Sequence, residues 1–141
     1  MKTNIFVNLP VANLEETKRF FKGLGYSFNK QFTDNNAACL IIEDNIYAML
    51  VRAEFFKQFI PKRKITDTKK MVEVAVCLSA DSRQQVDDWA DKAISLGATE
   101  NKIEMMEKQD SMYGRSINDL DGHVWEILWM DPKAIQPVEK I

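Results

Sequence analysis

The sequence contains one histidine, two cysteines and few glycines. With a single histidine, neither a histidine-rich zinc centre nor the H-E-x-x-H pair of zinc proteases can be built. The sequence also lacks a glycine-rich phosphate loop and a G-x-S-x-G nucleophile elbow. These absences exclude the common nucleotide-binding and hydrolase sites.

Long apolar runs and a strong net charge are absent as well. The longest apolar runs, residues 37–42 and 46–51, are far shorter than the roughly 20 residues that a membrane-spanning helix needs. The first residues lack the apolar core and cleavage site of a signal peptide, so we expect a cytoplasmic protein with no membrane partner. A net charge of -2 provides no field that would attract nucleic acid, which we do not expect as a partner.

Both cysteines, Cys39 and Cys77, stand among apolar neighbours in strand-like segments. A free thiol in such a position usually packs as a small apolar side chain. The alternatives are a redox, metal-binding or disulfide role, which would require a geometry that the sequence does not define.

The 141 residues, 45% of them hydrophobic and 28% charged, fit a single domain with a sizeable core. The pattern of residues 4–60 is repeated in residues 71–131, and residues 61–70 have the composition of a linker. Each repeat is predicted to form a strand, a helix and three further strands. Because neither half would bury a comfortable core alone, we expect the halves to fold as one unit.

In the first half, Asn13 is a typical helix N-cap and Gly25 a typical helix stop, which predicts a helix over residues 13–24. Asn and Asp between the later segments favour tight turns. The predicted strands are residues 4–11, 26–33, 37–43 and 46–52, and a short helical segment follows at 54–60.

In the second half, apolar residues recur on one face of residues 82–96, and Gly97 follows as a helix stop. A shift of 78 residues superposes residues 44–50 on 122–128, which pairs Ala48 with Glu126. The predicted strands of this half are residues 71–78, 102–107, 112–117 and 124–130.

Residues 113–116, followed by Asp121-Gly122-His123 and the strand 124–127, resemble the last hairpin of the vicinal oxygen chelate superfamily. Its members include glyoxalase I, extradiol dioxygenases, fosfomycin resistance enzymes and bleomycin resistance proteins. The resemblance extends over residues 7–132 and implies an α+β fold of two tandem βαβββ modules with cup-shaped mixed sheets. It also implies a homodimer, because a second chain often completes such cups.

The resemblance further implies that a small organic ligand, and often a divalent metal, binds inside the cup. It places Glu126 at the superfamily's terminal glutamate ligand and Glu73 at a position where histidine is common, so both are predicted metal ligands. Phe6 and Ala48 stand at the corresponding positions of the first half, and neither can coordinate a metal.

Glu126 is also the predicted catalytic residue, as metal ligand or general base, because a carboxylate in an apolar strand needs a cation or hydrogen-bond donors beside it. The alternative is a structural glutamate paired with Arg115 or with a backbone donor. Glu73 either lines the cup near Glu126 or lies at a solvated strand edge. His123 is expected to form hydrogen bonds in a turn or at the surface.

The predicted ligand-binding residues are Tyr47, Tyr113, Arg115 and Trp125. Arg115 either holds a substrate carboxylate in a bidentate fork or forms a salt bridge at the rim. Tyr47 and Trp125 either line the pocket or contribute to a dimer contact.

Two functions therefore stay open. In the first, a divalent ion on Glu73 and Glu126 polarises vicinal oxygens of a small substrate, as in a lyase or dioxygenase. In the second, the protein binds and sequesters a small molecule of antibiotic type without a metal and without catalysis.

Overall fold

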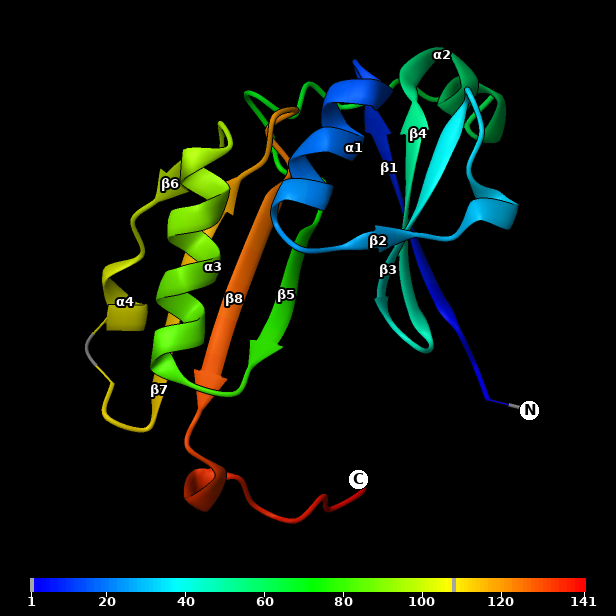
Figure 1. Ribbon diagram of the computed structural model, residues 1–141. Helices are drawn as coiled ribbons and strands as arrows, with labels where there is room; N and C mark the ends of the chain where they lie inside the picture. Colours follow the sequence, from blue (N-terminus) through cyan, green and yellow to red (C-terminus); the bar gives the residue numbers. More distant parts are fainter. Residues whose placement is uncertain (1, 108) are drawn as a thin grey trace. The chain divides into compact units, whose positions relative to one another are not determined.

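Each half of the chain forms a four-stranded mixed sheet with a helix against one face (Figure 1). The computed structural model describes residues 2–107 and 109–141. Its contacts divide the chain into a first unit, Met1–Glu73, and a second unit, Val74–Ile141. Both units follow the order strand, helix, strand, strand, strand, which confirms the predicted α+β class and the βαβββ pattern.

In the first unit the strand order is β1-β4-β3-β2, with β1 parallel to β4 and the other pairs antiparallel. The elements of this unit are β1 (Ile5–Val11), α1 (Leu14–Gly23), β2 (Ser27–Phe28), η1 (Lys30–Phe32), β3 (Ala37–Glu43), β4 (Ile46–Arg52), α2 (Ala53–Phe56) and η2 (Lys57–Phe59).

Helix α1 begins and ends as its caps predict. The side chain of Asn13 accepts a hydrogen bond from the backbone N–H of Glu16 at 3.1 Å, and Gly25 takes a φ of 107° after the last turn. Phe20 and Phe21 of the helix are buried against the sheet. The sheet contributes to this core the buried residues Leu9, Val11, Ala38, Leu40, Ala48 and Leu50.

In the second unit the strand order is β5-β8-β7-β6, again with one parallel pair, β5 and β8. The elements of this unit are β5 (Ala75–Ala80), α3 (Arg83–Ser95), β6 (Thr99–Asn101), α4 (Glu104–Glu107), β7 (Met112–Asn118), β8 (Val124–Met130) and η3 (Pro132–Ala134).

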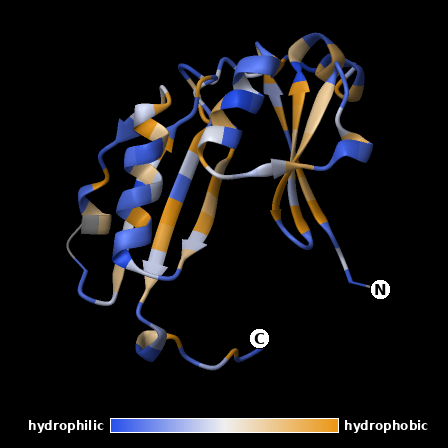
Figure 2. Ribbon diagram, viewed as in Figure 1, coloured by the Kyte–Doolittle hydropathy of each residue, from blue (hydrophilic) through white to orange (hydrophobic). Residues whose placement is uncertain are grey.

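The core of the second unit lies between α3 and its sheet. Val86, Ala90 and Ala93 of α3 are fully buried, as are Ile117 of β7 and Trp125 of β8. Figure 2 shows the result as apolar bands on the strands and a largely hydrophilic outer side on α1 and α3. No helix in the described ranges is long and apolar enough to cross a bilayer.

Three predicted strands are wrong in part. Within residues 26–33 only Ser27–Phe28 pairs, because the Asn29 side chain accepts a hydrogen bond from the N–H of Gln31 and starts the turn η1. Residues 104–107 are helical rather than extended, since their sequence Glu-Met-Met-Glu consists of good helix formers. The strand of this region is instead β6, which begins two residues after Gly97.

The strand predicted at residues 71–78 begins four residues later, at Ala75. Its first pair is Ala75 with Val124, the first residue of β8. Residues before Ala75 therefore have no position opposite them on β8, and Glu73 lies outside the sheet.

Candidate ligand-binding site

Glu126 lies at the middle of β8, on the face of the second sheet that is turned away from α3. We call this the open face of the sheet. Its register partners are Cys77 on β5 and Ser116 on β7, and residues directly opposite on paired strands share a face. Trp125 and Ile127, the neighbours of Glu126 in sequence, are buried on the helix side. Glu126 itself is half-buried.

Hydrogen bonds extend this polar row toward β6. Asn101 is the register partner of Ser116, and its side-chain amide donates to the Ser116 hydroxyl at 3.2 Å. The amides of Asn101 and Asn118 also bond to each other in both directions, at 3.0 Å and 2.7 Å. Asn118 donates in addition to the hydroxyl of Thr99. The open face thus carries a preformed set of amide, hydroxyl, carboxylate and thiol groups.

Cys77 is exposed on this face, whereas Cys39 in the first unit is buried. The prediction that both thiols pack as apolar side chains therefore holds for Cys39 alone, because β5 presents Cys77 on its uncovered side. Burial and the negative charge of the neighbouring Glu126 carboxylate raise the pKa of Cys77. The thiol form of Cys77 is thereby favoured, so it is a hydrogen-bond donor rather than an activated nucleophile.

Glu73, the second predicted metal ligand, is exposed and precedes β5. The position opposite Glu126 on the parallel strand belongs to Cys77 instead. Glu73 therefore does not pair with Glu126 across β5 and β8, because the strand starts later than the sequence predicts, and its exposed position agrees with the solvated alternative.

Tyr113 and Arg115 of β7 lie on the helix side of the sheet, opposite to Glu126. The Tyr113 hydroxyl donates to Asp87 of α3 at 2.6 Å. The Arg115 guanidinium donates to Asp91 of α3 at 2.8 Å. Strand alternation separates both residues from Ser116, whose side chain joins the row on the open face.

Arg115 forms ion pairs with three carboxylates, on Asp87, Asp91 and Glu100. Burial opposes its charge, but the hydrogen bonds that it donates to Glu100 and Asp91 outweigh that effect and raise the pKa of Arg115. Of the two alternatives for this residue, the structure thus shows the salt bridge. Arg115 is therefore not the partner that one form of the structural alternative gave to Glu126.

Trp125 is 1% exposed, and its indole N–H donates to the carboxylate of Asp119 at 2.9 Å. The other oxygen of Asp119 accepts hydrogen bonds from the backbone N–H groups of Asp121 and His123. His123 lies in the turn before β8, as predicted, but is buried rather than at the surface. Trp125 therefore stabilises the β7–β8 turn through its hydrogen bond to Asp119.

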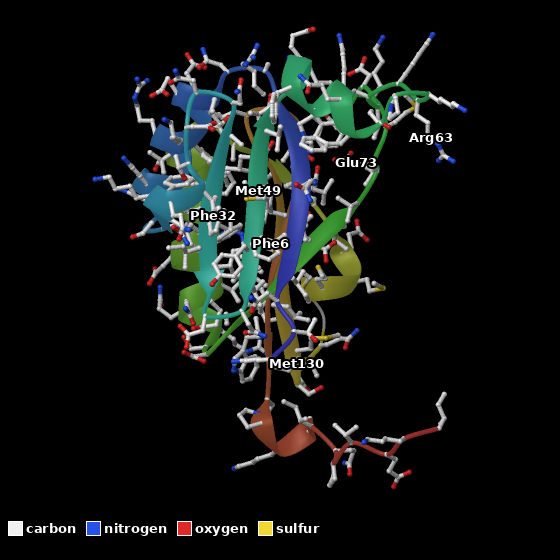
Figure 3. The ribbon with its side chains drawn as sticks, turned by 90° about the vertical axis from the view of Figure 1, so that its right-hand side faces the viewer. Phe6, Phe32, Met49, Arg63, Glu73 and Met130 are labelled. Atoms are coloured by element: carbon white, nitrogen blue, oxygen red, sulfur yellow. The ribbon has the colours of Figure 1, made fainter. Side chains whose placement is uncertain are left out.

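Tyr47 lies on the face of the first sheet that is turned away from α1. Its ring stacks on that of its register partner Phe6, with centroids 4.9 Å apart and planes 12° from parallel. Phe6 is 45% exposed, and Met49 follows two residues after Tyr47 on the same side (Figure 3). This surface is apolar and aromatic, in contrast to the polar row of the second unit.

The repeat that pairs Ala48 with Glu126 does not preserve the side of the sheet. Ala48 is fully buried on the α1 side, whereas Glu126 lies on an open face. A shift of one residue in the alignment of two strands moves every side chain to the other face of the sheet. On the face of the first sheet turned away from α1, β4 therefore carries Tyr47 and Met49, whereas β8 carries Glu126 on the corresponding face of the second sheet. Neither side chain is a carboxylate or an imidazole.

The donor set fits a protein-bound metal poorly. Among the residues that the structure describes, no three histidine, cysteine, aspartate or glutamate side chains come together into a group that could hold a metal ion. Glu126 and Cys77 supply two donors, whereas a catalytic site usually has three protein ligands. We therefore derive no chemical step through a metal.

The sequence interpretation missed Ser116, Asn101 and Asn118 as members of this face. Alternation along β7 would have grouped Ser116 with Asn118, since they are two residues apart. The match to Glu126 requires the register between strands, which no single segment encodes.

No known protein-family model and no curated protein matches the sequence. Solved structures do match. The hypothetical protein SA1046 from S. aureus is 24% identical, with a TM-score of 0.74 over 92% of this chain and 95% of that one. A glyoxalase/bleomycin resistance protein/dioxygenase family enzyme from Burkholderia phytofirmans is 16% identical, with a TM-score of 0.73 over 89% and 96%. The fosfomycin resistance protein FosX from Listeria monocytogenes is 13% identical, with a TM-score of 0.65 over 100% and 96%.

These structural neighbours confirm the fold that the resemblance implies, the one shared by members of the vicinal oxygen chelate superfamily. The similarity covers nearly the whole chain in each case.

Proposed function

We propose that this chain, which has the glyoxalase/bleomycin resistance/dioxygenase fold, binds a small organic ligand on the open face of its second sheet. The observation that carries the proposal is the position of Glu126, half-buried between Cys77 and Ser116 on a face turned away from the helix. Binding without a resident metal is favoured over a metal-assisted lyase or dioxygenase reaction, because among the described residues of this face two candidate donors, rather than three, lie side by side.

The chemistry of the face favours a ligand with a cationic or hydrogen-bond-donating group. Within residues 2–107 and 109–141, Glu126 takes part in no ion pair, so no protein cation balances its charge. A half-buried carboxylate gains most from a partner that is itself charged. An amine that bonds to Glu126, with further polar groups against Asn101 and Asn118, which are half-buried, would match the row.

The experiment is a binding screen that follows thermal unfolding and tryptophan fluorescence with a panel of small organic amines and matched carboxylates. We expect amines to bind, and Glu126→Gln to weaken their binding by roughly tenfold or more while the fold is retained. Glu139→Gln, which removes an exposed carboxylate from the C-terminal segment, is the control. Equal binding by Glu126→Gln would contradict the assigned role.

Calorimetric titration of the wild type and of Glu126→Gln with manganese, iron, cobalt, nickel and zinc tests the metal-assisted alternative. A stoichiometric metal that is lost in Glu126→Gln would favour the lyase or dioxygenase function. It would also require a further ligand beyond Glu126 and Cys77.

The exposed Phe6–Tyr47 stack of the first unit supports a contact surface of its own, either for a small ligand or for the predicted homodimer. Tyr47→Ala removes half of the stack. Loss of dimer in sedimentation velocity would assign the surface to self-association. A monomeric wild type whose ligand affinity falls in Tyr47→Ala would assign it to ligand binding.

A further inference from the structure

The segment between η2 and β5 carries a concentration of positive charge. We call residues 61–70 the basic loop. It contains five cations and one acidic residue, Asp67, in a chain whose net charge is -2. The five cations are Lys62, Arg63, Lys64, Lys69 and Lys70.

The charges of the basic loop are available to a partner. All five cationic side chains are exposed, and Arg63 projects outward from the loop in Figure 3. None of the five takes part in an ion pair within the part of the chain that the structure describes. Asp67 is engaged in the loop itself, because its carboxylate accepts a hydrogen bond from the N–H of Lys69.

Turns define the course of the basic loop. The N–H of Arg63 donates to the carbonyl of Ile60 at 3.0 Å. Further along, the N–H groups of Lys70 and Met71 both donate to the carbonyl of Asp67. These bonds form a turn at each end of the loop, so Lys62 and Arg63 at one end and Lys69 and Lys70 at the other are carried by hydrogen-bonded backbone.

Exposed apolar side chains flank the basic loop on both sides. Phe59 precedes it and is 62% exposed, and its ring packs edge-on against Phe55 with centroids 5.6 Å apart. Met71 and Val72 follow it and are 56% and 65% exposed. Large apolar residues held in water beside a cluster of cations are a pattern typical of proteins that rest on an anionic bilayer surface.

We propose that the basic loop and its flanking residues Phe59, Met71 and Val72 form a contact surface for anionic lipid headgroups. The cations meet the negative surface, and the apolar side chains enter the boundary between headgroups and acyl chains. A nucleic acid fits this surface less well, because an aromatic ring can stack on a base but Met71 and Val72 gain nothing from phosphates. The expectation of no membrane partner rested on the length of apolar runs, which excludes spanning a bilayer but not contact with its surface.

The test is co-sedimentation of the full chain with large vesicles of phosphatidylcholine alone, or of phosphatidylcholine with about one-third phosphatidylglycerol, at low and physiological salt. We expect binding only to the anionic vesicles, and weaker binding as salt rises. The double variant Lys62→Glu/Arg63→Glu should bind at least roughly tenfold more weakly, since each basic residue near an anionic surface contributes about 1 kcal/mol.

A matched control reverses two cations elsewhere on the first unit, in Arg19→Glu/Lys22→Glu on α1. This variant should bind nearly as well as the wild type. Phe59→Ala leaves the charge unchanged and should weaken vesicle binding by about fivefold, because it removes the inserted ring. Circular dichroism melting of each variant confirms that the fold is intact.

Three outcomes would overturn the proposal. The first is no binding to anionic vesicles even at low salt. The second is an equal loss in the α1 control, which would indicate an unspecific response to net charge. The third is tighter binding to a DNA or RNA oligonucleotide than to vesicles together with no effect of Phe59→Ala, which would assign the surface to nucleic acid.

Discussion

Cys77 and Glu126 are register partners on the parallel strands β5 and β8, and burial, together with the charge of the carboxylate, raises the pKa of the thiol. The pair stands on the face of the sheet where Arg115 and Tyr113 are absent. It follows that the chemistry of this face depends on how the carboxylate and the thiol influence each other.

Glu126→Gln should lower the pKa of Cys77, because the variant removes a neighbouring negative charge that disfavours the thiolate. The thiolate is the reactive species, so alkylation by iodoacetamide near pH 8 should become about threefold faster. Mass spectrometry of the modified peptide measures the rate at Cys77. Buried Cys39 serves as the internal control and should stay unmodified in both proteins. An unchanged rate would show that the carboxylate does not act on the thiol.

Asp119→Asn should destabilise the second unit by about 1–3 kcal/mol at pH 7. Asparagine can still accept the hydrogen bonds from the backbone N–H groups, but its amide then opposes the indole N–H of Trp125. Urea unfolding, followed by tryptophan fluorescence, measures the difference in the free energy of unfolding.

The same variant tests the pH dependence of the wild type. Burial raises the pKa of Asp119, and the charge of His123 and the Trp125 hydrogen bond counteract this only in part. The folded state therefore takes up a proton before the unfolded state does, so this group adds stability as pH falls from neutrality toward the ordinary carboxyl pKa of about 4. The advantage of wild type over Asp119→Asn should grow over that range. A shrinking difference would mean that the native pKa is lowered.

Arg115→Ala should destabilise the protein by about 1–2 kcal/mol. The change removes a side chain that is 15% exposed and joins α3 to the sheet, but its partners are more exposed and solvent screens part of their attraction. Arg115→Lys keeps the charge without the planar fork and should recover only part of the loss. Neither variant should alter ligand affinity on the open face. Reduced affinity at unchanged stability would support the predicted carboxylate clamp instead.

Gly97→Ala should cost more stability than Gly25→Ala, although both glycines follow a helix with similar backbone angles, φ of 112° and 107°. The left-handed conformation costs any residue with a Cβ about 1 kcal/mol. A Cβ on Gly97 would also approach Leu120 to 3.0 Å, whereas one on Gly25 would meet no atom within 4 Å. Urea unfolding of the two variants gives the comparison, and equal losses would assign the whole effect to backbone strain.

The sequence predicts the second hairpin strand of each half without error, and the reason is local. Asn and Asp turns precede β4 and β8, and alternating residues continue to Arg52 and Met130. The same is true of α1 and α3, whose N-caps, Asn13 and Ser82, accept the hydrogen bonds that their types favour. Signals contained within a few residues are therefore enough for these elements.

The candidate site could be predicted only in part because it depends on pairing between distant strands. Glu126 stands out from its own strand, but Cys77 becomes its neighbour only through the register of β5 and β8. The late start of β5 removes Glu73 from the sheet, and a shift of one residue puts Ala48 on the wrong face. A shift in where a strand begins or in how it aligns leaves its own residue pattern unchanged, but it changes which residues of the adjacent strands lie beside it.

The parallel pairing of the first and last strands also has a kinetic consequence. Ile5 of β1 pairs with Ile46 of β4, and Ala75 of β5 pairs with Val124 of β8. In each sheet, the first strand therefore pairs with a strand that lies some forty to fifty residues further along the chain. The hairpin of β3 and β4, joined by a tight turn, has no such delay. Closing a long loop costs conformational entropy before the contacts that it brings together stabilise the fold. We therefore expect the hairpins to form early, and β1 and β5 to pair with their sheets last.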